Sequence, residues 1–284
     1  MSKVGLVLEG GSLRGLYSAG VLDIMMDNNI DVDVIVGTSA GALFGPNYFS
    51  KQRGRAIRYN KRFCRDRRNI SMWSWLFTGN VVNKNFAYYK ITKKLDVFDN
   101  ETFIKSGKEL YVTATNIESG ECEYFKINDV LSDMEKLRAT SAIPIMTKPV
   151  KINGKYYLDG GVSDSIPIKK CLELGCDKII VVLTQPKKYK KKIISDKKIK
   201  MINIIFKKYP KLISRMLNRH NEYNECIKYI NNLEKKNKVF VIRPSEKLDI
   251  NLIERNPDKL EKIYQVGIKD MNKNIDDLKK YLVL

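Results

Sequence analysis

Residues 32–44 read VDVIVGTSAGALF, and this stretch decides the fold class of the chain. Val32–Val36 is a short apolar run, which is typical of a strand buried on both faces of a parallel sheet. The pattern Gly-x-Ser-x-Gly follows at once, and apolar residues continue from Ala42 as they would at the start of a helix. The stretch therefore predicts a strand, a tight glycine turn that carries Ser39, and a helix.

A second strand-to-helix pattern occurs near the N-terminus. Val4–Leu8 is another short apolar run; glycines follow it, and apolar residues then recur at helical spacing as far as Asn28. Two strands joined by one helix should lie parallel, with a right-handed crossover. Both glycine turns should therefore lie at the same edge of the sheet, where open α/β folds place their ligands.

Further strands are predicted by apolar runs that lie between turn residues. They are expected at Leu110–Ala114, Glu123–Ile127, Val150–Ile152, Tyr156–Leu158, Lys178–Leu183 and Val239–Ile242, with a closing helix around Leu260–Leu282. From about Pro186 the composition becomes rich in lysine and the pattern becomes helical. Residues 1–185 are therefore expected to form a catalytic α/β core, and residues 186–284 a basic, mainly helical extension packed on it.

Gly37, Ser39 and Gly41 form the strongest chemical signal. A nucleophilic serine must stand clear of the sheet on a sharp turn, and glycines two positions away on either side let the backbone pass closely. The helix that follows adds a field at its N-terminus that favours negative charge near the serine. Ser39 is therefore the candidate nucleophile, and a turn without catalysis is the alternative.

The loop after the first strand reads EGGSLRG over residues 9–15. Its glycines do not match Gly-x-Gly-x-x-Gly, and no Gly-Lys-Ser/Thr follows, so neither a dinucleotide site nor a P-loop is indicated. Acyl transfer needs backbone N–H groups aimed at an oxyanion, and a Gly-Gly turn at a helix start can present them. Arg14 can brace this loop or add positive charge.

A serine nucleophile needs a general base, and the sequence offers two. Asp159 precedes Gly160-Gly161 directly after a predicted strand, although an Asp-Gly pair is often only a turn. His220 is the one histidine of the chain and lies in a polar, basic stretch that is predicted to be helical. The order Ser39, Asp159, His220 matches that of α/β-hydrolases, but there the nucleophile normally follows more than two strands. Asp159 is favoured, and a triad with His220 stays as an alternative.

Four ordered motifs resemble the patatin-like phospholipase family. The glycine loop 9–15, the turn GTSAG at 37–41 and DGG at 159–161 resemble its three signature elements. ATSAIP at 139–144 looks like the family's block of small residues and proline ahead of the aspartate. The resemblance covers roughly residues 4–185.

This resemblance implies a fold and a set of roles. The fold would be a three-layer α/β/α sandwich with a mostly parallel central sheet. Ser39 would be the nucleophile and Asp159 the base of a dyad that needs neither metal nor cofactor. The oxyanion hole would comprise Gly10, Gly11 and Ser12, with Arg14 beside them.

Two departures from the family pattern fall in the glycine loop. Glu9 stands where many relatives have Asp, and Ser12 stands where many have a third Gly. Neither change removes a main-chain N–H group, so little damage to function is expected. Residues 44–50 and the basic C-terminal part look most like the bacterial branch of single-domain cytoplasmic members.

The activity implied by the resemblance is hydrolysis of fatty-acyl esters of (lyso)phospholipids or related lipids through an acyl-enzyme. Two alternatives stay open. One is a soluble carboxylesterase or thioesterase that does not act on membrane lipid. The other is a catalytically idle member that keeps the fold and binds lipid or nucleic acid.

The formal net charge of +20 is unevenly distributed. Residues 186–284 carry +14 of it, and residues 187–200 hold eight basic residues against one acid. Such charge fits a lysine-rich solvated surface, nucleic acid or an anionic membrane, and charge alone does not choose. Given the resemblance, we expect peripheral contact with an anionic membrane and no nucleic acid. The amphipathic segment Ile199–Leu217 could lie on that membrane or pack on the core.

The N-terminus lacks a signal peptide and no apolar run is long enough to span a bilayer, so a cytoplasmic location is expected, peripheral to the inner membrane face. The five cysteines lack the spacing of zinc or redox sites. With a single histidine, a structural metal site is not expected.

Overall fold

The computed structural model describes residues 2–283 and contains one mixed sheet. Its strands are β1 (Val4–Leu8), β2 (Val34–Gly37), β3 (Glu109–Asn116), β4 (Cys122–Ile127), β5 (Val150–Ile152), β6 (Lys155–Asp159), β7 (Lys178–Val182) and β8 (Phe240–Ile242). Their order is β5-β6-β3-β2-β1-β7-β8, with β4 also paired to β3. The strands from β3 to β8 in this order are parallel, and β4, β5 and β6 form an antiparallel edge. The predicted α/β class with a mostly parallel sheet is confirmed.

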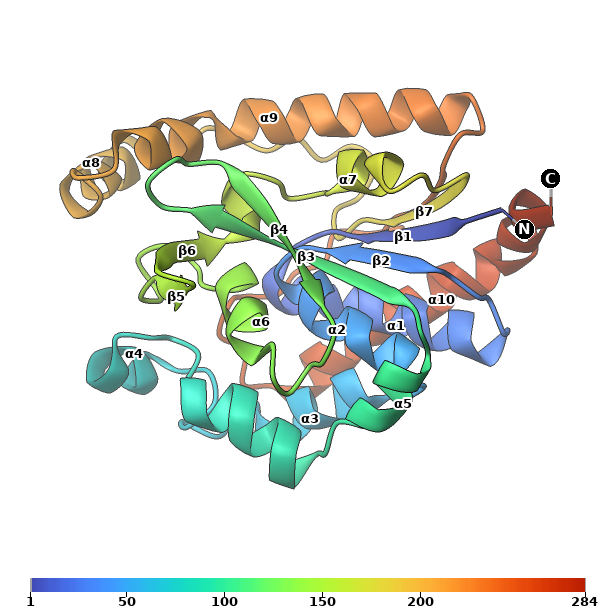
Figure 1. The fold of residues 1–284 in the computed structure, drawn as a ribbon, viewed down its shortest axis with the longest axis horizontal. Helices are drawn as coiled ribbons and strands as arrows, with labels where there is room; N and C mark the ends of the chain where they lie inside the picture. The colour runs from blue at the N-terminus through green and yellow to red at the C-terminus, as the bar shows by residue number, and fades with distance from the viewer. Residues whose placement is uncertain (1, 284) are drawn as a thin grey trace.

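Helices cover both faces of this sheet (Figure 1). The helices are α1 (Gly15–Asp27), α2 (Ala40–Phe49), α3 (Arg55–Phe63), α4 (Met72–Thr78), α5 (Asn100–Lys105), α6 (Met134–Thr140), α7 (Ile168–Glu173), α8 (Asp196–Ile205), α9 (Pro210–Lys235) and α10 (Pro257–Val283), with short 3-10 turns η1 (Ser12–Arg14) and η3 (Gly160–Val162) and a π-helix η2 (Lys84–Leu95). Helices α7 and α9 lie over one face, and α1, α2 and α10 lie over the other. The result is a three-layer sandwich.

The central strands read as continuous apolar runs because both of their faces are covered. In β1, Leu6 and Leu8 belong to the core beneath α1 and α2, whereas Val7 belongs to the core beneath α7 and α9. All three side chains are fully buried. A half-exposed strand would instead alternate apolar and polar residues.

The predicted parallel pairing of the first two strands is confirmed. Leu8 at the end of β1 lies opposite Gly37 at the end of β2. The glycine loop and the serine turn therefore leave the sheet side by side, at the edge formed by the carboxyl ends of both strands.

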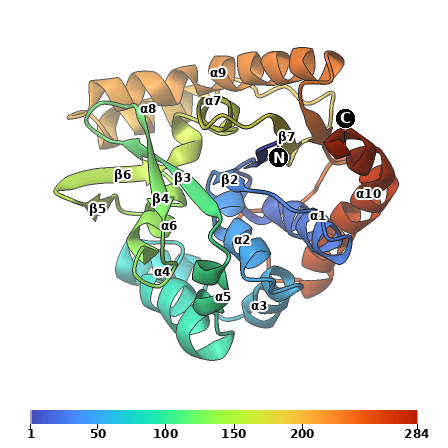
Figure 2. The same cartoon turned by 45° about the vertical axis from the view of Figure 1, so that its right-hand side comes forward.

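The C-terminal part of the chain joins the same layers. Its strand β8 extends the sheet beyond β7, and α10 lies along α1 (Figures 1 and 2). Tyr264 on α10 donates a 2.6 Å hydrogen bond to the carboxylate of Asp23 on α1. The division at residue 185 stays a prediction. Between residues 2 and 283, no helix has the length and apolar character needed to cross a membrane.

The amphipathic segment predicted over Ile199–Leu217 contains two helices, because α8 ends before Pro210 and α9 begins there. Its apolar side chains divide into two groups. Ile202, Phe206 and Leu212 are buried in the core, whereas Met201, Ile204 and Ile205 are exposed.

Candidate active site

Ser39 lies on the sharp turn between β2 and α2. Its φ of 52° and ψ of −118° lie outside the regions that non-glycine residues usually adopt. The Ser39 N–H donates a 2.9 Å hydrogen bond to Oγ1 of Thr140, which belongs to the ATSAIP block. At Gly41 a Cβ atom would lie 2.6 Å from the carbonyl oxygen of Leu8, so glycine is needed for α2 to pass over β1. These contacts hold the serine turn in place.

Asp159 meets Ser39 from the end of β6. Ser39 Oγ donates a 2.7 Å hydrogen bond to Asp159 Oδ2, although 120 positions separate the two residues. Asp159 Oδ1 accepts a second hydrogen bond of 2.7 Å from the N–H of Gly161. Ser39 is 7% exposed and Asp159 is 8% exposed. The structure thus brings the predicted nucleophile and the predicted base into direct contact.

Burial raises the pKa of Asp159 above its ordinary value. The hydrogen bonds from Ser39 and Gly161 and the positive charge of Arg219 act in the opposite direction. A carboxylate with a raised pKa is a stronger base than an exposed aspartate, which suits removal of a proton from a serine hydroxyl.

The glycine loop packs against the serine turn, but its amides are not equivalent. The Gly10 N–H already donates to the carbonyl oxygen of Ser165, at 3.2 Å. In the described part of the chain, no acceptor takes the N–H of Gly11 or Ser12. Ser12 has a φ of 51°, a left-handed conformation that glycine adopts at little cost.

Glu9 links the glycine loop to the C-terminal part of the chain. Its Oε2 accepts the N–H of Thr184 at 2.5 Å, and its Oε1 accepts the hydroxyl of Tyr223 on α9 at 2.8 Å. Burial raises the pKa of Glu9, while these two hydrogen bonds and the positive charges of Arg14 and Lys191 lower it.

An apolar cavity of about 140 Å³ reaches Ser39. Its walls are mostly apolar side chains, which include Leu13, Leu43, Phe44, Ile91, Phe98 and Leu137. An apolar cavity of this kind favours an apolar chain because burial of each CH₂ group contributes about 0.8 kcal/mol.

A second cavity, of about 160 Å³, also reaches Ser39 and has several charged side chains in its lining. Arg14, Lys191 and Arg219 line it together with the carboxylates of Glu9 and Asp159. Lys191 Nζ lies 4.4 Å from the centre of the Tyr223 ring. Burial, with repulsion from Arg219 and Arg14, lowers the pKa of Lys191 to about 8, and the charge of Glu9 opposes this shift. We call this space the cationic cavity.

His220 lies outside this arrangement. Its Nδ1 is 3.0 Å from the carbonyl oxygen of Leu217 on the same helix, α9. Among the described residues it forms no hydrogen bond with Ser39 or Asp159, and it lines neither cavity. In residues 2–283, no group of three His, Cys, Asp or Glu side chains is placed to hold a metal ion.

Two cations of the cationic cavity were missed by the sequence analysis. Lys191 is one of many lysines in the basic run 187–200, and Arg219 directly precedes His220. Neither residue belongs to a motif, so no sequence signal separates them from the other basic residues. Their position becomes evident from the packing of α9 over the glycine loop.

The family of the chain is established by comparison with known proteins. The model of the patatin-like phospholipase family matches residues 6–172, and that of a domain of unknown function, DUF6363, matches residues 209–283. The chain therefore belongs to the patatin-like phospholipase family, whose members are lipid acyl hydrolases. The resemblance noted from the motifs is confirmed.

Several relatives share this region. Uncharacterized protein YjjU of Escherichia coli strain K12 is 30% identical over 188 residues, which cover 65% of this chain and 52% of the relative. Probable lipid hydrolase 463L of Invertebrate iridescent virus 6 is 28% identical, with 70% and 76% covered. Lysophospholipase NTE1 of Saccharomyces cerevisiae is 27% identical, with 63% and 10% covered. The matched regions thus span about half of YjjU and a tenth of NTE1.

Among solved structures, VipD from Legionella pneumophila is similar with a TM-score of 0.46 and 13% sequence identity, over 97% of this chain and 67% of that one.

Proposed function

We propose that the protein is a serine acyl hydrolase that releases fatty acids from lysophospholipids, phospholipids or related lipids. The observation that carries this proposal is the 2.7 Å hydrogen bond from Ser39 to Asp159, with Ser39 also lining an apolar cavity. A lipid substrate is also what membership of the family implies. Two of the relatives are named as a lysophospholipase and a probable lipid hydrolase.

The first half of the reaction forms an acyl-enzyme. Ser39 Oγ attacks the ester carbonyl carbon while Asp159 Oδ2 takes the hydroxyl proton. The carbonyl oxygen becomes an oxyanion, and the free N–H groups of Gly11 and Ser12 stabilise it. Collapse of this intermediate breaks the bond to the alcohol oxygen, which receives the proton from Asp159. We leave Gly10 out of this oxyanion hole because its N–H already donates to Ser165.

The second half of the reaction releases the fatty acid. Water attacks the acyl carbon while Asp159 takes one of its protons. The same N–H groups stabilise the second oxyanion. Its collapse breaks the bond to Ser39 Oγ, which regains a proton from Asp159.

The dyad can be tested by covalent labelling with a fluorophosphonate, which reacts with activated serines. Wild type and His220→Ala should be labelled, whereas Ser39→Ala should not. Labelling that persists in Ser39→Ala, or that disappears in His220→Ala, would contradict the dyad. The released products from a lipid mixture, identified by mass, then distinguish a lipid hydrolase from an esterase restricted to short-chain esters.

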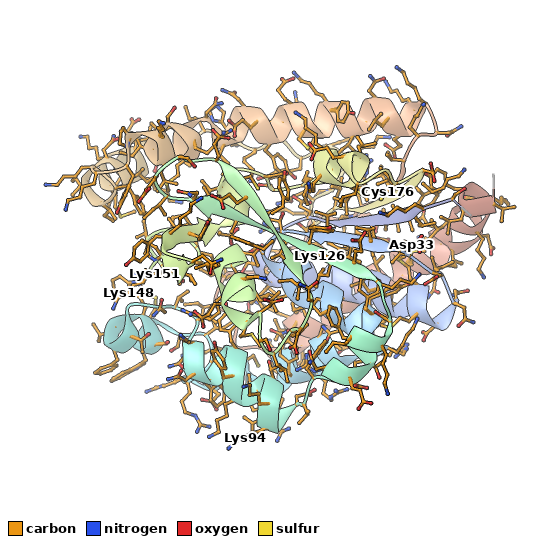
Figure 3. All side chains as sticks on the ribbon, viewed as in Figure 1. Asp33, Lys94, Lys126, Lys148, Lys151 and Cys176 are labelled. Atoms are coloured by element: carbon orange, nitrogen blue, oxygen red, sulfur yellow. The ribbon has the colours of Figure 1, made fainter. Side chains whose placement is uncertain are left out.

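We also propose that the protein acts at an anionic lipid surface. Helix α4 exposes large apolar side chains on consecutive turns, namely Met72, Trp73, Trp75, Leu76 and Phe77. Helices α4 and α8 lie at the same end of the molecule, on either side of the β5–β6 hairpin (Figures 1 and 2). Lys148 and Lys151 project at this end (Figure 3). Exposed tryptophans among lysines suit the interface of an anionic membrane.

Co-sedimentation with phosphatidylcholine vesicles, with and without phosphatidylserine, tests this contact over a salt series. The double variant Trp73→Ser/Phe77→Ser should bind at least about tenfold more weakly, because burial of two aromatic side chains is lost. Val97→Ser removes another exposed apolar side chain and serves as the matched control. The proposal would be overturned if binding were the same with and without anionic lipid and the same in the wild type and the double variant.

A further inference from the structure

Three cations surround the polar space beside the nucleophile. Arg14, Lys191 and Arg219 line the cationic cavity, and none of them forms an ion pair with a carboxylate in the described part of the chain. The cavity also contains Glu9 and Asp159, so it carries a surplus of one positive charge when all five groups are ionised.

Two of these cations have buried donors without an acceptor. The Nε atoms of Arg14 and Arg219 are buried and form no hydrogen bond with any described residue. Arg219 Nη2 makes one long contact, of 3.4 Å, with Ser165 Oγ. Buried charged donors are normally paired, because loss of hydration is otherwise uncompensated. The cavity therefore offers unused guanidinium donors to an anionic group.

The carboxylates of the cavity do not accept hydrogen bonds from these guanidinium donors. Glu9 is occupied by Thr184 and Tyr223, and Asp159 by Ser39 and Gly161. An external anion would consequently add the missing acceptors. Arginine presents a planar set of donors that matches the oxygens of a phosphate.

The position of the cationic cavity indicates to what kind of molecule such an anion would belong. Ser12 and Ser39 line both the cationic and the apolar cavity, so the nucleophile lies where the two spaces meet. In a glycerophospholipid, the short glycerol backbone separates the acyl ester from the phosphate. One molecule of this kind can place its chain in the apolar cavity, its ester at Ser39 and its phosphate among the cations.

We propose that Lys191 and Arg219, with Arg14, form a binding site for the phosphate of a phosphate-ester substrate. The inference rests on the proposed acyl hydrolase function and specifies its substrate class. Lys191 and Arg219 both lie outside the region 6–172 that the family model matches. Arg219 lies inside the domain of unknown function, for which the inference supplies a role in substrate selection.

A matched pair of substrates tests the site. Lysophosphatidate and monoacylglycerol with the same acyl chain differ only in the phosphate, so the ratio of their kcat/KM values reports phosphate binding. Lys191→Gln and Arg219→Gln should each lower this ratio about tenfold to a hundredfold, as expected for loss of a charged hydrogen bond. Use of the ratio removes any effect of Arg219 on the shared base Asp159. Lys192→Gln, an exposed neighbour with the same change of charge, should leave the ratio unchanged.

Binding of inorganic phosphate, measured by calorimetry, distinguishes a site for free phosphate from a site for the phosphate of the substrate. Inorganic phosphate should bind the wild type weakly and bind both variants more weakly still. Phosphate binding without any change in the substrate ratio would mean that the site takes free phosphate, and would overturn the substrate assignment. A ratio that neither variant changes, with no phosphate binding, would overturn the site itself.

If the wild type hydrolyses neither substrate, the proposed function fails independently of the site. Phosphate binding that is lost in Lys191→Gln and Arg219→Gln would then still support the anion site, and absence of binding would refute it. Thermal unfolding of each variant identifies any that does not fold, and two independent variants are available.

Discussion

The two cavities that meet at Ser39 differ in their chemistry and in the part of the chain that builds them. The walls of the apolar cavity come from residues 12–143, apart from Leu252. The cationic cavity adds Lys191, Arg219 and Tyr223 from the lysine-rich C-terminal part. The proposed reaction and acyl-chain site thus lie in the region shared with the family, whereas two of the three cations beside the candidate nucleophile lie outside it.

The difference in chemistry between the two cavities also predicts how binding in each responds to pH, salt and substitution. Apolar binding depends on the area removed from water and is nearly independent of pH and salt. Charge-assisted binding depends on the protonation state of each group and is directional. Substitutions in the apolar cavity should therefore alter chain-length preference, and substitutions in the cationic cavity should alter phosphate preference and the pH profile.

The largest expected effect is a loss of activity on every substrate, whichever cavity binds it. Asp159→Asn keeps the shape of the base but cannot accept a proton, so kcat should fall by about 10⁴ or more on phosphate and neutral esters alike. The variant should unfold at the wild-type temperature or above it, because a buried charge is removed. Steady-state kinetics and thermal unfolding check both points. A loss confined to phosphate substrates would mean that Asp159 serves binding and not proton transfer.

A smaller effect is expected from a substitution that tests whether the acyl chain binds in the apolar cavity. Ala87 on η2 lines the apolar cavity, and Ala87→Phe would occupy part of its volume. Activity on long-chain esters should fall about tenfold to a hundredfold, because two or three methylene groups lose their burial at about 0.8 kcal/mol each. Acetyl esters, which do not reach the cavity, should react as with the wild type. Equal losses on both substrates would show that the chain does not enter there.

The pH profile should separate the two roles of Arg219. In the proposed mechanism Asp159 acts as a base in its ionised form, so activity should be lost as the pH falls through its pKa, which burial raises above the usual value of about 3.9. The positive charge of Arg219 favours the carboxylate, so Arg219→Gln should raise this pKa further. The acidic limb should move to higher pH by about half a unit to one unit. Ser39 and Gly161 donate to the same carboxylate and are unchanged in the variant.

The cationic cavity should lose its preference for phosphate at alkaline pH. Lys191 has a pKa lowered to about 8, so it is charged below this pH and neutral above it. The cavity thus loses the charge of one of its three cations, while Glu9 stays an acceptor for Tyr223. The ratio of lysophosphatidate to monoacylglycerol hydrolysis should fall several-fold between about pH 7 and pH 9. A ratio that stays flat over this range in the wild type would contradict a role for Lys191.

Much of the fold and of the reaction site follows from local patterns. The central strands are recognisable because burial on both faces requires continuous apolar residues, as in Val4–Leu8. Ser39 and Asp159 could be paired from the sequence because each follows a predicted strand within a family motif. Parallel strands then bring loops that are distant in the chain to one edge of the sheet.

The remaining features depend on packing between distant parts of the chain. The Gly10 amide is occupied by Ser165, and nothing near either residue in the sequence indicates this contact. Lys191 lies in an irregular segment among similar lysines, and Arg219 faces the site through the orientation of α9. Such residues belong to no periodic pattern or motif, so the sequence does not distinguish them from the many other basic residues of the C-terminal part.

The smallest expected effect concerns the residue next to Arg219. His220 also lies on α9, but it lines neither cavity, and its ring contacts its own helix at Leu217. His220→Ala should therefore change kcat/KM less than about twofold on either substrate, and it should leave the acidic limb unmoved, because the imidazole takes no part in the proposed proton transfer. Neighbouring substitutions at 219 and 220 would then differ sharply although both alter a basic side chain on one helix. Equal effects would mean that Arg219 acts through the general stability of α9 and not through the cationic cavity.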